Sequence, residues 1–405
     1  IVNRVVSAVS QTSRHRVLMV TGAYFPELSG AGLQCRSLTQ VLKRSADFIV
    51  FTTTAQPSLP AAEDIDGVPV FRVPIQPRRL ASKLVGLWRF TMLFTTHRHQ
   101  FSIVHLHGFS QKSVLFMALA AVFRKAVAIK LTGVNFDDPM AIRRRGRWTY
   151  WWYSRAALFI GVSPKFQMLY EQAGLPGQRL TMIPNGVDVT RFRPALVDEC
   201  ETLRRQFGLP TTGQVVLFIG FFSIDKCPDI LFDAWLRATE GQTTQSTLFF
   251  VGATRSTYHE ISSPLVERIR HESTLLEGTN RRVVFLESIL DVEQVYRCAD
   301  VFVLPSVREG LPNALLEAMA SGLGCVASRL EGVTDTIIQD GVNGRLVEPS
   351  NVDELSNVLK VLLAQPNVTT DMGCRARKTI EMRFDLLDTG RKHLAAYRSL
   401  ESGLA

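Results

Sequence analysis

Short apolar runs rich in β-branched residues alternate with stretches of helical spacing along most of this chain. VLMVTGAY (17–24), VVLFIG (215–220) and VFVLP (301–305) are examples of the apolar runs. Apolar positions recur three and four residues apart near residues 33–45, 79–98, 110–125, 140–157 and 164–173. Continuous apolar runs are typical of parallel strands buried on both faces. The alternation therefore predicts an α/β protein with doubly wound, mostly parallel sheets.

Two such α/β series follow each other along the chain. The turn formers of IPNGVDVTRFRP (183–194) and a polar stretch up to Thr212 separate them. We predict an N-terminal Rossmann-like domain over residues 1–205 and a C-terminal one over 206–384. Residues 385–405 remain as a final helical segment.

Composition narrows the choice of partners and compartment. The 405 residues carry a net charge of +9, which suits an anionic partner. Basic residues do not combine with aromatic residues on strands in a nucleic-acid motif, so nucleic acid is disfavoured. The six cysteines are scattered without a C-x-x-C pair, which predicts free thiols in a reducing compartment. With no clear signal peptide and no membrane-length apolar run, we expect a cytoplasmic protein.

Residues 301–322 combine a buried strand, a turn and a helix with two carboxylates. Glu309 lies in the turn and Glu317 about one turn inside the helix, for which Asn313 is the predicted N-cap. Ligands of parallel sheets bind beyond the carboxyl ends of strands, and helix N-termini attract phosphate. Glu317 would then accept from ribose hydroxyls and Glu309 from sugar hydroxyls. Ordinary solvated glutamates at a helix start are the alternative.

This stretch resembles the E-x7-E signature of the retaining group 1, or family 4, glycosyltransferases with the GT-B fold. The following segment resembles the family's next block, with Asp335 in its acidic place and a D-G-x-N-G turn over 340–344. The resemblance implies two Rossmann-like domains facing a central cleft, with residues 385–405 packing back on the first. It also implies a nucleoside diphosphate sugar in the C-terminal domain, its diphosphate near the amides of Gly310, Leu311, Pro312 and Asn313.

Two further blocks bear on the donor. Gly30 and Gly32 precede a predicted helix and could approach a phosphate, although a tight turn is the simpler interpretation. In relatives the corresponding loop lies beside the donor phosphates. Residues 219–235 resemble the family's G-R-x4-K-G block, with Lys226 retained and Phe221 in the arginine place. Lys226 would neutralise the leaving diphosphate, and Arg308 or Arg329 could replace the missing cation.

Acceptor-side candidates come from the N-terminal half. His105 and His107 occupy one strand, on opposite faces or at its mouth, and the family's V-H-x-H block makes His107 a pocket candidate. The next strand-end loop carries Lys130, Thr132, Asn135 and Asp137 where relatives commonly have a histidine. A solvated turn is the alternative for Asp137 and Asp138.

Arg143–Arg155 (RRRGRWTYWWYSR) combines arginines with aromatic residues. This composition suits contact with an acidic membrane surface. A core helix packed through Trp148, Trp151 and Trp152 is the alternative.

We therefore expect a metal-independent retaining glycosyltransferase without a cofactor, in which Glu309 and Lys226 are catalytic. Its partners would be a nucleotide sugar and a glycan, lipid-linked or small-molecule acceptor of glycan or polysaccharide biosynthesis. It would be cytoplasmic, peripheral on the inner face of the membrane. A degenerate, non-catalytic nucleotide-sugar binder is the alternative, motivated by Phe221. A GT-B epimerase or phosphorylase is disfavoured by the E-x7-E spacing.

Overall fold

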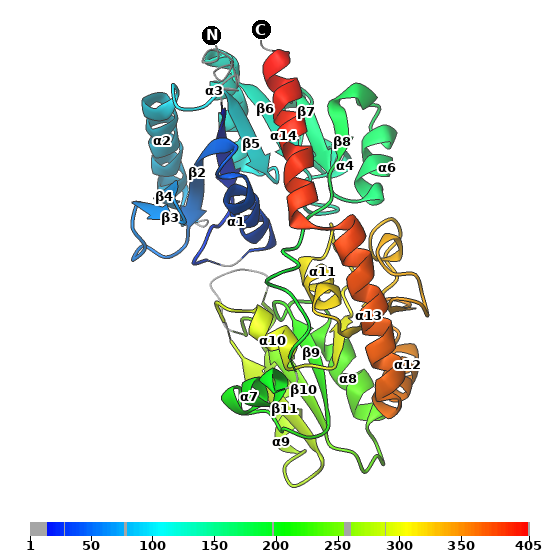
Figure 1. Cartoon of the computed structure of the whole chain (residues 1–405). Coiled ribbons are helices and arrows are strands. Elements are labelled where there is room, and N and C mark those ends of the chain that lie inside the picture. The colour runs from blue at the N-terminus through cyan, green and yellow to red at the C-terminus, as the bar shows by residue number, and fades with distance from the viewer. Residues whose placement is uncertain are drawn as a thin grey trace, which may run out of the picture. The chain divides into compact units, whose positions relative to one another are not determined.

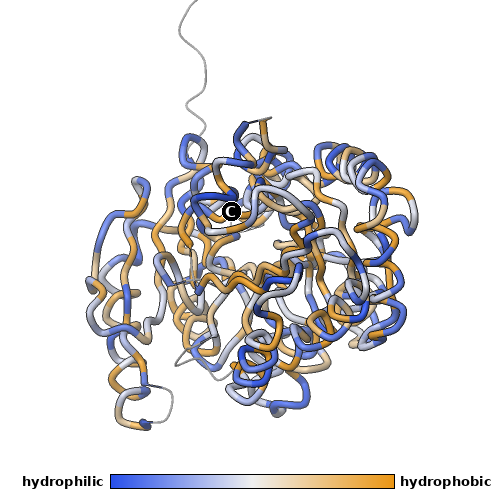
Figure 2. Tube along the Cα trace, turned by 90° about the horizontal axis from the view of Figure 1, so that it is seen from below, coloured by the Kyte–Doolittle hydropathy of each residue, from blue (hydrophilic) through white to orange (hydrophobic). Residues whose placement is uncertain are grey.

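The computed structural model describes residues 14–27, 29–76, 79–196, 198–254, 261–287 and 289–403. Strands and helices alternate along the chain as the apolar pattern predicts, and they form two sheets (Figure 1). Hydrophobic residues gather along the strands, while the outer coils carry hydrophilic ones (Figure 2).

The first sheet has eight strands in the order β3-β4-β2-β1-β5-β6-β7-β8. Its strands are β1 (His15–Thr21), β2 (Ala46–Thr54), β3 (Ala62–Ile65), β4 (Val68–Pro74), β5 (Ile103–His107), β6 (Ala126–Lys130), β7 (Leu158–Gly161) and β8 (Leu180–Met182). β1 lies parallel to both β2 and β5. The short strand β3 is antiparallel to β4, and Asp66 and Gly67 form the turn between them.

The helices of this half are α1 (Gly30–Leu42), α2 (Leu80–His97), α3 (Gln111–Val122), α4 (Pro139–Arg144), α5 (Arg147–Tyr153) and α6 (Pro164–Gln172), followed by the 3-10 turn η1 (Gly177–Arg179). Strand order reverses direction between β1 and β5. Because parallel crossovers are right-handed, α1 lies on one face of the sheet, and α2, α3 and α5 lie on the other. The last helix, α14 (Leu386–Ser402), shares the α1 face, where Gly390 meets Leu42.

The second sheet has six strands in the order β11-β10-β9-β12-β13-β14. They are β9 (Gln214–Ile219), β10 (Ser246–Val251), β11 (Arg281–Leu286), β12 (Val301–Leu304), β13 (Gly324–Ser328) and β14 (Arg345–Val347). The helices of this half are α7 (Glu199–Gln206), α8 (Pro228–Ala238), α9 (Ser263–Thr274), α10 (Glu293–Arg297), α11 (Asn313–Ala320), α12 (Val352–Ala364) and α13 (Pro366–Arg383), with the 3-10 turn η2 (Thr334–Thr336). β9 is parallel to β10 and β12, and Trp235 of α8 is buried in the core beneath them.

Three local predictions need correction. Gly30 and Gly32 do not precede the first helix but form its first turn, with Ser29 as the N-cap. The pattern near 140–157 is two helices rather than one, because Gly146 adopts a φ of 125° between α4 and α5. Asn313 is the first residue of α11, and Pro312 occupies the cap position.

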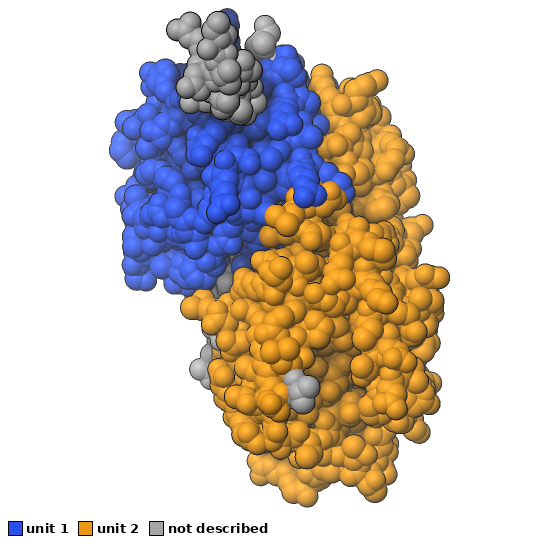
Figure 3. Space-filling view, in the orientation of Figure 1, with its two compact units in different colours: residues 1–130, 146–159, 390–405 blue, residues 131–145, 160–389 orange. Residues whose placement is uncertain are grey.

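The chain divides into two compact units (Figure 3). One comprises residues 1–130, 146–159 and 390–405, and the other comprises 131–145 and 160–389. Most of α14 therefore belongs to the unit of β1. The predicted boundary between residues 205 and 206 stays a prediction. Within the described residues, no helix combines the length and apolar character that crossing a membrane requires.

Candidate active site

Glu309 lies in the turn that connects β12 to α11. Three contacts hold this turn: Val307 N donates to Asp225 O at 2.9 Å, Ser163 Oγ donates to Gly310 O at 2.9 Å, and Asn185 Nδ2 donates to Leu311 O at 3.4 Å. Pro312 then occupies the cap position of α11. The first amides of α11 have no partners one turn earlier in the helix, so this end favours an anion.

Lys226 lies in the turn after β9, beside Glu309. Its Nζ donates to Glu309 Oε1 at 2.6 Å, and the Glu309 side chain is only 9% exposed. The two residues meet because β9 and β12 are adjacent parallel strands and both turns leave from their carboxyl ends. The strand order reverses at this pair, and ligands of open parallel sheets bind at such switch points. The structure therefore brings the two predicted catalytic residues together.

The predicted substitutes for the missing arginine have acidic partners. Arg308 pairs with Asp225, and Arg329 lies 3.8 Å from Asp340 and 3.5 Å from Glu348. Phe221, in the arginine place, is half-buried. Lys226 is thus the cation that the structure shows against Glu309.

Gly310 presses against the loop that follows β6. A Cβ atom at this position would overlap the Thr132 main-chain oxygen, so only glycine allows the approach. This contact places Thr132, an acceptor-side candidate, directly beside the donor-side turn.

The Asp137 carboxylate supports that loop from inside. It accepts from Thr132 N at 3.0 Å, Thr132 Oγ1 at 2.7 Å and Gly133 N at 2.9 Å. Burial raises its pKa to about 6, although these hydrogen bonds favour the ionised form. Asp138 caps α4 by accepting from Ala141 N, so neither acid lies in a solvated turn. Asn135, with a φ of 61°, is exposed.

Glu317 lies one turn inside α11 and accepts a hydrogen bond from Tyr296. The Tyr296 hydroxyl donates to Glu317 Oε2 at 2.8 Å. Burial raises the pKa of Glu317 to about 7, opposed by this hydrogen bond and by the charge of Arg191. The pKa of Tyr296 is raised well above its ordinary value by burial and by Glu317. This carboxyl group can therefore change its charge near neutral pH.

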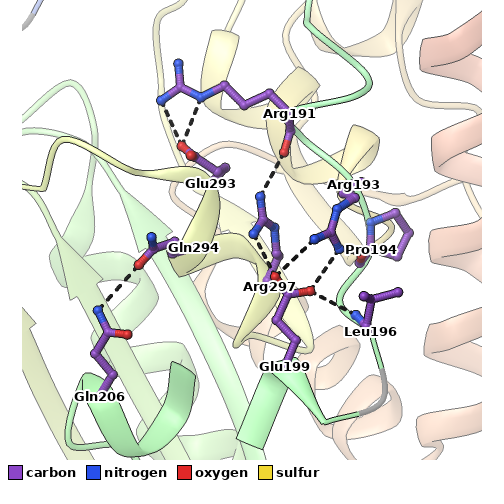
Figure 4. A network of polar contacts seen from close by, with 9 residues as sticks. All are labelled: Arg191, Arg193, Pro194, Leu196, Glu199, Gln206, Glu293, Gln294 and Arg297. Atoms are coloured by element: carbon purple, nitrogen blue, oxygen red, sulfur yellow. Dashed lines mark hydrogen bonds and ion pairs between the residues drawn. The ribbon is translucent and has the colours of Figure 1, made fainter. Parts of the chain in front are cut away.

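A polar network fixes α10, the helix that carries Tyr296 (Figure 4). The Arg191 guanidinium donates two hydrogen bonds to Glu293 Oε2 of α10, at 2.8 and 3.0 Å. Arg297 of α10 donates to Arg191 O at 3.1 Å. Arg297 and Arg193 both bind Glu199, at 2.8 Å each. The linker after β8 is thereby tied to the helix that positions Tyr296 against Glu317.

The glycines of the other unit have a packing role. Gly32 N donates to Ser29 Oγ at 3.0 Å, and a Cβ on Gly32 would overlap the Ala23 main-chain oxygen. The loop from β1 into α1 therefore requires glycine for close approach. Phosphate binding by Gly30 and Gly32 stays a prediction.

His107 and Lys130 end the neighbouring strands β5 and β6 and are buried. His105 and His107 lie on the same face of β5, with ring centroids 4.4 Å apart, so the prediction of opposite faces is wrong. Residues two apart on a strand share a face. Neither ring nitrogen of His107 has a hydrogen-bond partner among the described residues. Burial lowers the pKa of Lys130 to about 8.

Sequence reasoning missed several side chains that hold these residues. Tyr296, Ser163 and Asn185 come from distant segments, and the Asn185 amide also donates to Asn313 Oδ1 at 2.8 Å. Asn185 was singled out as a turn former, which is the one signal that pointed to it. Among the described residues, no group of three or more His, Cys, Asp or Glu side chains is arranged to hold a metal ion.

Comparison with known proteins agrees with this geometry. Residues 213–365 match the family described as "Glycosyl transferases group 1", and residues 29–186 match "Glycosyl transferase 4-like domain". The chain is 23% identical to the UDP-Gal:alpha-D-GlcNAc-diphosphoundecaprenol alpha-1,3-galactosyltransferase of Escherichia coli, over 80% of this chain and 81% of that protein. It is 30% identical to a D-inositol 3-phosphate glycosyltransferase of Acidothermus cellulolyticus over 57% of this chain and 50% of that protein.

Solved structures agree on the fold. Alr3699/HepE of Anabaena, in complex with UDP and glucose, superposes with a TM-score of 0.77 at 21% identity, covering 95% of this chain and 100% of that one. Sucrose-phosphate synthase of Thermosynechococcus elongatus gives 0.76 at 20% identity, covering 96% and 100%. The family matches, the relatives and the two parallel-sheet halves agree: this chain belongs to the group 1 glycosyltransferases of the family 4 type and has the GT-B fold.

Proposed function

We propose that this protein is a retaining glycosyltransferase that transfers a sugar from a UDP-sugar to a lipid-linked or other glycan acceptor. The donor is suggested by the E. coli relative, whose name includes UDP-Gal, and by the Anabaena structure, which holds UDP and glucose. The same relative's name includes a diphosphoundecaprenol acceptor, and other relatives are named for D-inositol 3-phosphate. We also propose a cytoplasmic location on the inner face of the membrane, where a lipid-linked acceptor would be reached.

The ion pair of Lys226 and Glu309 is the observation that carries this proposal. Lys226, together with the amides at the start of α11, suits a diphosphate, and Glu309 suits the hydroxyls of the attached sugar. Stabilising charge on the departing diphosphate would be the main catalytic effect. Glu317, in the same helix, would accept from the ribose.

The placement of the groups that could take a proton supports retention. Inversion needs a general base opposite the leaving group. Asp137 uses its carboxylate on the backbone of its own loop, and His107 and Lys130 are both buried. In front-face transfer the bond from the anomeric carbon to the diphosphate oxygen breaks, and a bond to the acceptor oxygen forms. The acceptor proton then passes to the departing diphosphate.

We propose that this reaction needs neither a metal nor another cofactor, since Lys226 and the α11 amides supply the positive charge. Activity should persist after dialysis against EDTA. Loss of activity that Mg²⁺ or Mn²⁺ restores would contradict this part of the proposal.

A non-catalytic nucleotide-sugar binder is the second candidate, favoured by Phe221 in the arginine place and by the acidic partners of Arg308 and Arg329. Slow hydrolysis of the donor without acceptor separates the two, because a binder would leave the donor intact. The same reaction, followed by proton NMR of the first-formed product, gives the anomeric configuration. A product with the opposite configuration to the donor would refute retention.

A further inference from the structure

Helix α2 exposes its apolar side instead of burying it. Leu80, Leu84, Trp88 and Met92 recur every four residues and are 49–72% exposed. At 100° per residue they form one continuous arc, which Leu87 at 45% exposed also joins. Gly86, Phe90 and Phe94, on the side of the helix that adjoins Leu87, are buried. Contiguous exposed apolar area of this kind marks an interaction surface.

The charges around this arc have one sign. Lys83 and Arg89 are exposed on either side of it, and α2 contains no acidic residue. The parts of this unit that build α2, α3 and α5, residues 79–130 and 146–159, contain no aspartate or glutamate. The surface that these residues build is therefore cationic without interspersed acids.

Two neighbouring helices extend the surface. α2 contacts α3, and α3 contacts α5, so the three helices lie side by side on the face of the sheet away from α14. Val122, at the end of α3, is 73% exposed, and Trp148 and Trp151 of α5 are 67% and 41% exposed. The two indoles stack with centroids 5.4 Å apart, and the Arg155 guanidinium lies 3.5 Å from the Trp151 centroid. Exposed Trp with Arg is typical of the headgroup zone of a bilayer.

A cavity of about 360 Å³ opens where α3 and α5 end. Its size is that of a small-molecule site. Its lining combines apolar side chains with two cations: Met117, Ala121, Trp152, Leu400, Lys125 and Arg155. Because Leu400 belongs to α14, this cavity borders both faces of the sheet and is not part of the outer face of α2, α3 and α5.

We propose that the outer face of α2, α3 and α5, called here the docking face, binds the surface of an anionic lipid bilayer. Of the Arg143–Arg155 segment, residues 146–155 belong to this face, and α2 supplies most of its apolar part. A second copy of the chain fits poorly, because two cationic faces would repel. The apolar arc distinguishes it from a nucleic-acid surface, which needs phosphate contacts and stacking rather than leucines. The proposal does not depend on the glycosyltransferase mechanism.

The test is sedimentation of the whole protein with vesicles of phosphatidylcholine alone or with 30% phosphatidylglycerol. We expect binding only to the anionic vesicles, weakening as salt screens the charges. Lys83→Ala and Arg89→Ala should each weaken the partition coefficient about fivefold, from ~1 kcal/mol per basic residue near such a surface. The double variant Leu84→Gln/Trp88→Gln should abolish sedimentation, because both side chains would enter the interface.

Matched controls come from exposed residues of the other unit. Leu275→Gln/Met382→Gln removes two apolar side chains that are 71% and 77% exposed, and Lys360→Ala removes an exposed cation. These variants should bind as the wild type does, and circular dichroism should show all variants folded. Equal binding to neutral vesicles, no binding, or equal losses in test and control variants would overturn the proposal. So would a lipid-free dimer, by light scattering, that the α2 double variant dissociates.

Discussion

Replacing Glu317 by Gln tests whether this carboxyl group holds the ribose of the donor. The change keeps the size and the acceptor oxygen of the side chain but removes its charge and its titration. Tyr296 can still donate to the amide oxygen, so α10 and α11 keep their contact. Any change in nucleotide binding can then be assigned to the charge.

The raised pKa sets the expected magnitude. With a pKa of about 7, only about a tenth of Glu317 is ionised at pH 6 and about nine-tenths at pH 8. Ribose hydroxyls bind the carboxylate more strongly than the neutral acid, because hydrogen bonds to a charged group contribute roughly 1.5–3 kcal/mol and neutral ones roughly 0.5–1.5. Wild-type affinity for UDP should therefore rise about three- to fivefold from pH 6 to pH 8, because the neutral acid still binds, only more weakly. Glu317→Gln should bind UDP about five- to tenfold more weakly at pH 8.

Isothermal titration calorimetry with UDP at pH 6, 7 and 8 measures both quantities. The difference between wild type and Glu317→Gln removes the titration of the UDP phosphate, which both proteins share. A parallel pH dependence in the two proteins, or equal affinity at pH 8, would refute the ribose role.

Stability gives an independent check on the same carboxyl group. Its pKa is higher in the folded chain than the ordinary 4.5, so the folded state binds the extra proton between pH 4.5 and about 7. Its stabilising contribution is complete below pH 4.5 and is lost as pH rises through 7. Relative to Glu317→Gln, the wild type should lose roughly 2.5 kcal/mol of unfolding free energy from pH 5 to pH 8 by urea titration. A constant difference would show that the pKa is not raised.

Three further outcomes are expected. Lys226→Ala should lower kcat about 10²–10³-fold, because it removes the cation for the diphosphate, whereas Arg308→Ala should change kcat little. Equal losses in steady-state assays would assign diphosphate binding to Arg308 as well. Gly310→Ala should lower the unfolding free energy by about 1–3 kcal/mol, because the added Cβ meets the facing main-chain oxygen of Thr132. The control is Gly177→Ala, whose added Cβ meets nothing within 4 Å. Equal urea midpoints for the two variants would contradict this contact. Burial and two neighbouring histidines hold the pKa of His105 well below its ordinary value. The unfolded chain therefore binds more protons at acidic pH, and the unfolding free energy should fall as pH drops below about 6.5. A urea midpoint that stays constant from pH 7.5 to pH 5 would contradict this prediction.

The elements themselves could be predicted because their signals are local. Helix α2 was expected over 79–98 and covers Leu80–His97. Helix α6 was expected over 164–173 and covers Pro164–Gln172. In both cases the apolar spacing and the terminal residues decide the bounds within a few positions. The family resemblance, carried by the same local motif around Glu309, was also sufficient for the fold.

The contacts within the site could not be predicted because they join distant residues. Lys226 and Glu309 are 83 positions apart, and they meet only because β9 and β12 are neighbours in the sheet order. A hydrogen bond of 2.7 Å joins His105 Nδ1 to the hydroxyl of Tyr397, which lies 292 positions further along the sequence, and no local pattern indicates it. The break between α4 and α5 was missed for another reason: glycine at position 146 tolerates positive φ, but glycine also occurs inside helices.

The pairing of Lys226 with Glu309 explains how one site can be stable both empty and loaded. A largely buried carboxylate without a partner is costly, and removing one member of a buried ion pair destabilises proteins by about 3–5 kcal/mol. Without a ligand the two side chains satisfy each other. On the proposed function, a nucleotide sugar carries both an anion for Lys226 and hydroxyl donors for Glu309, so binding exchanges one set of partners for another without stranding a charge. A free diphosphate would serve only the lysine, and a free sugar only the glutamate. The pair therefore favours the intact donor over either of its halves.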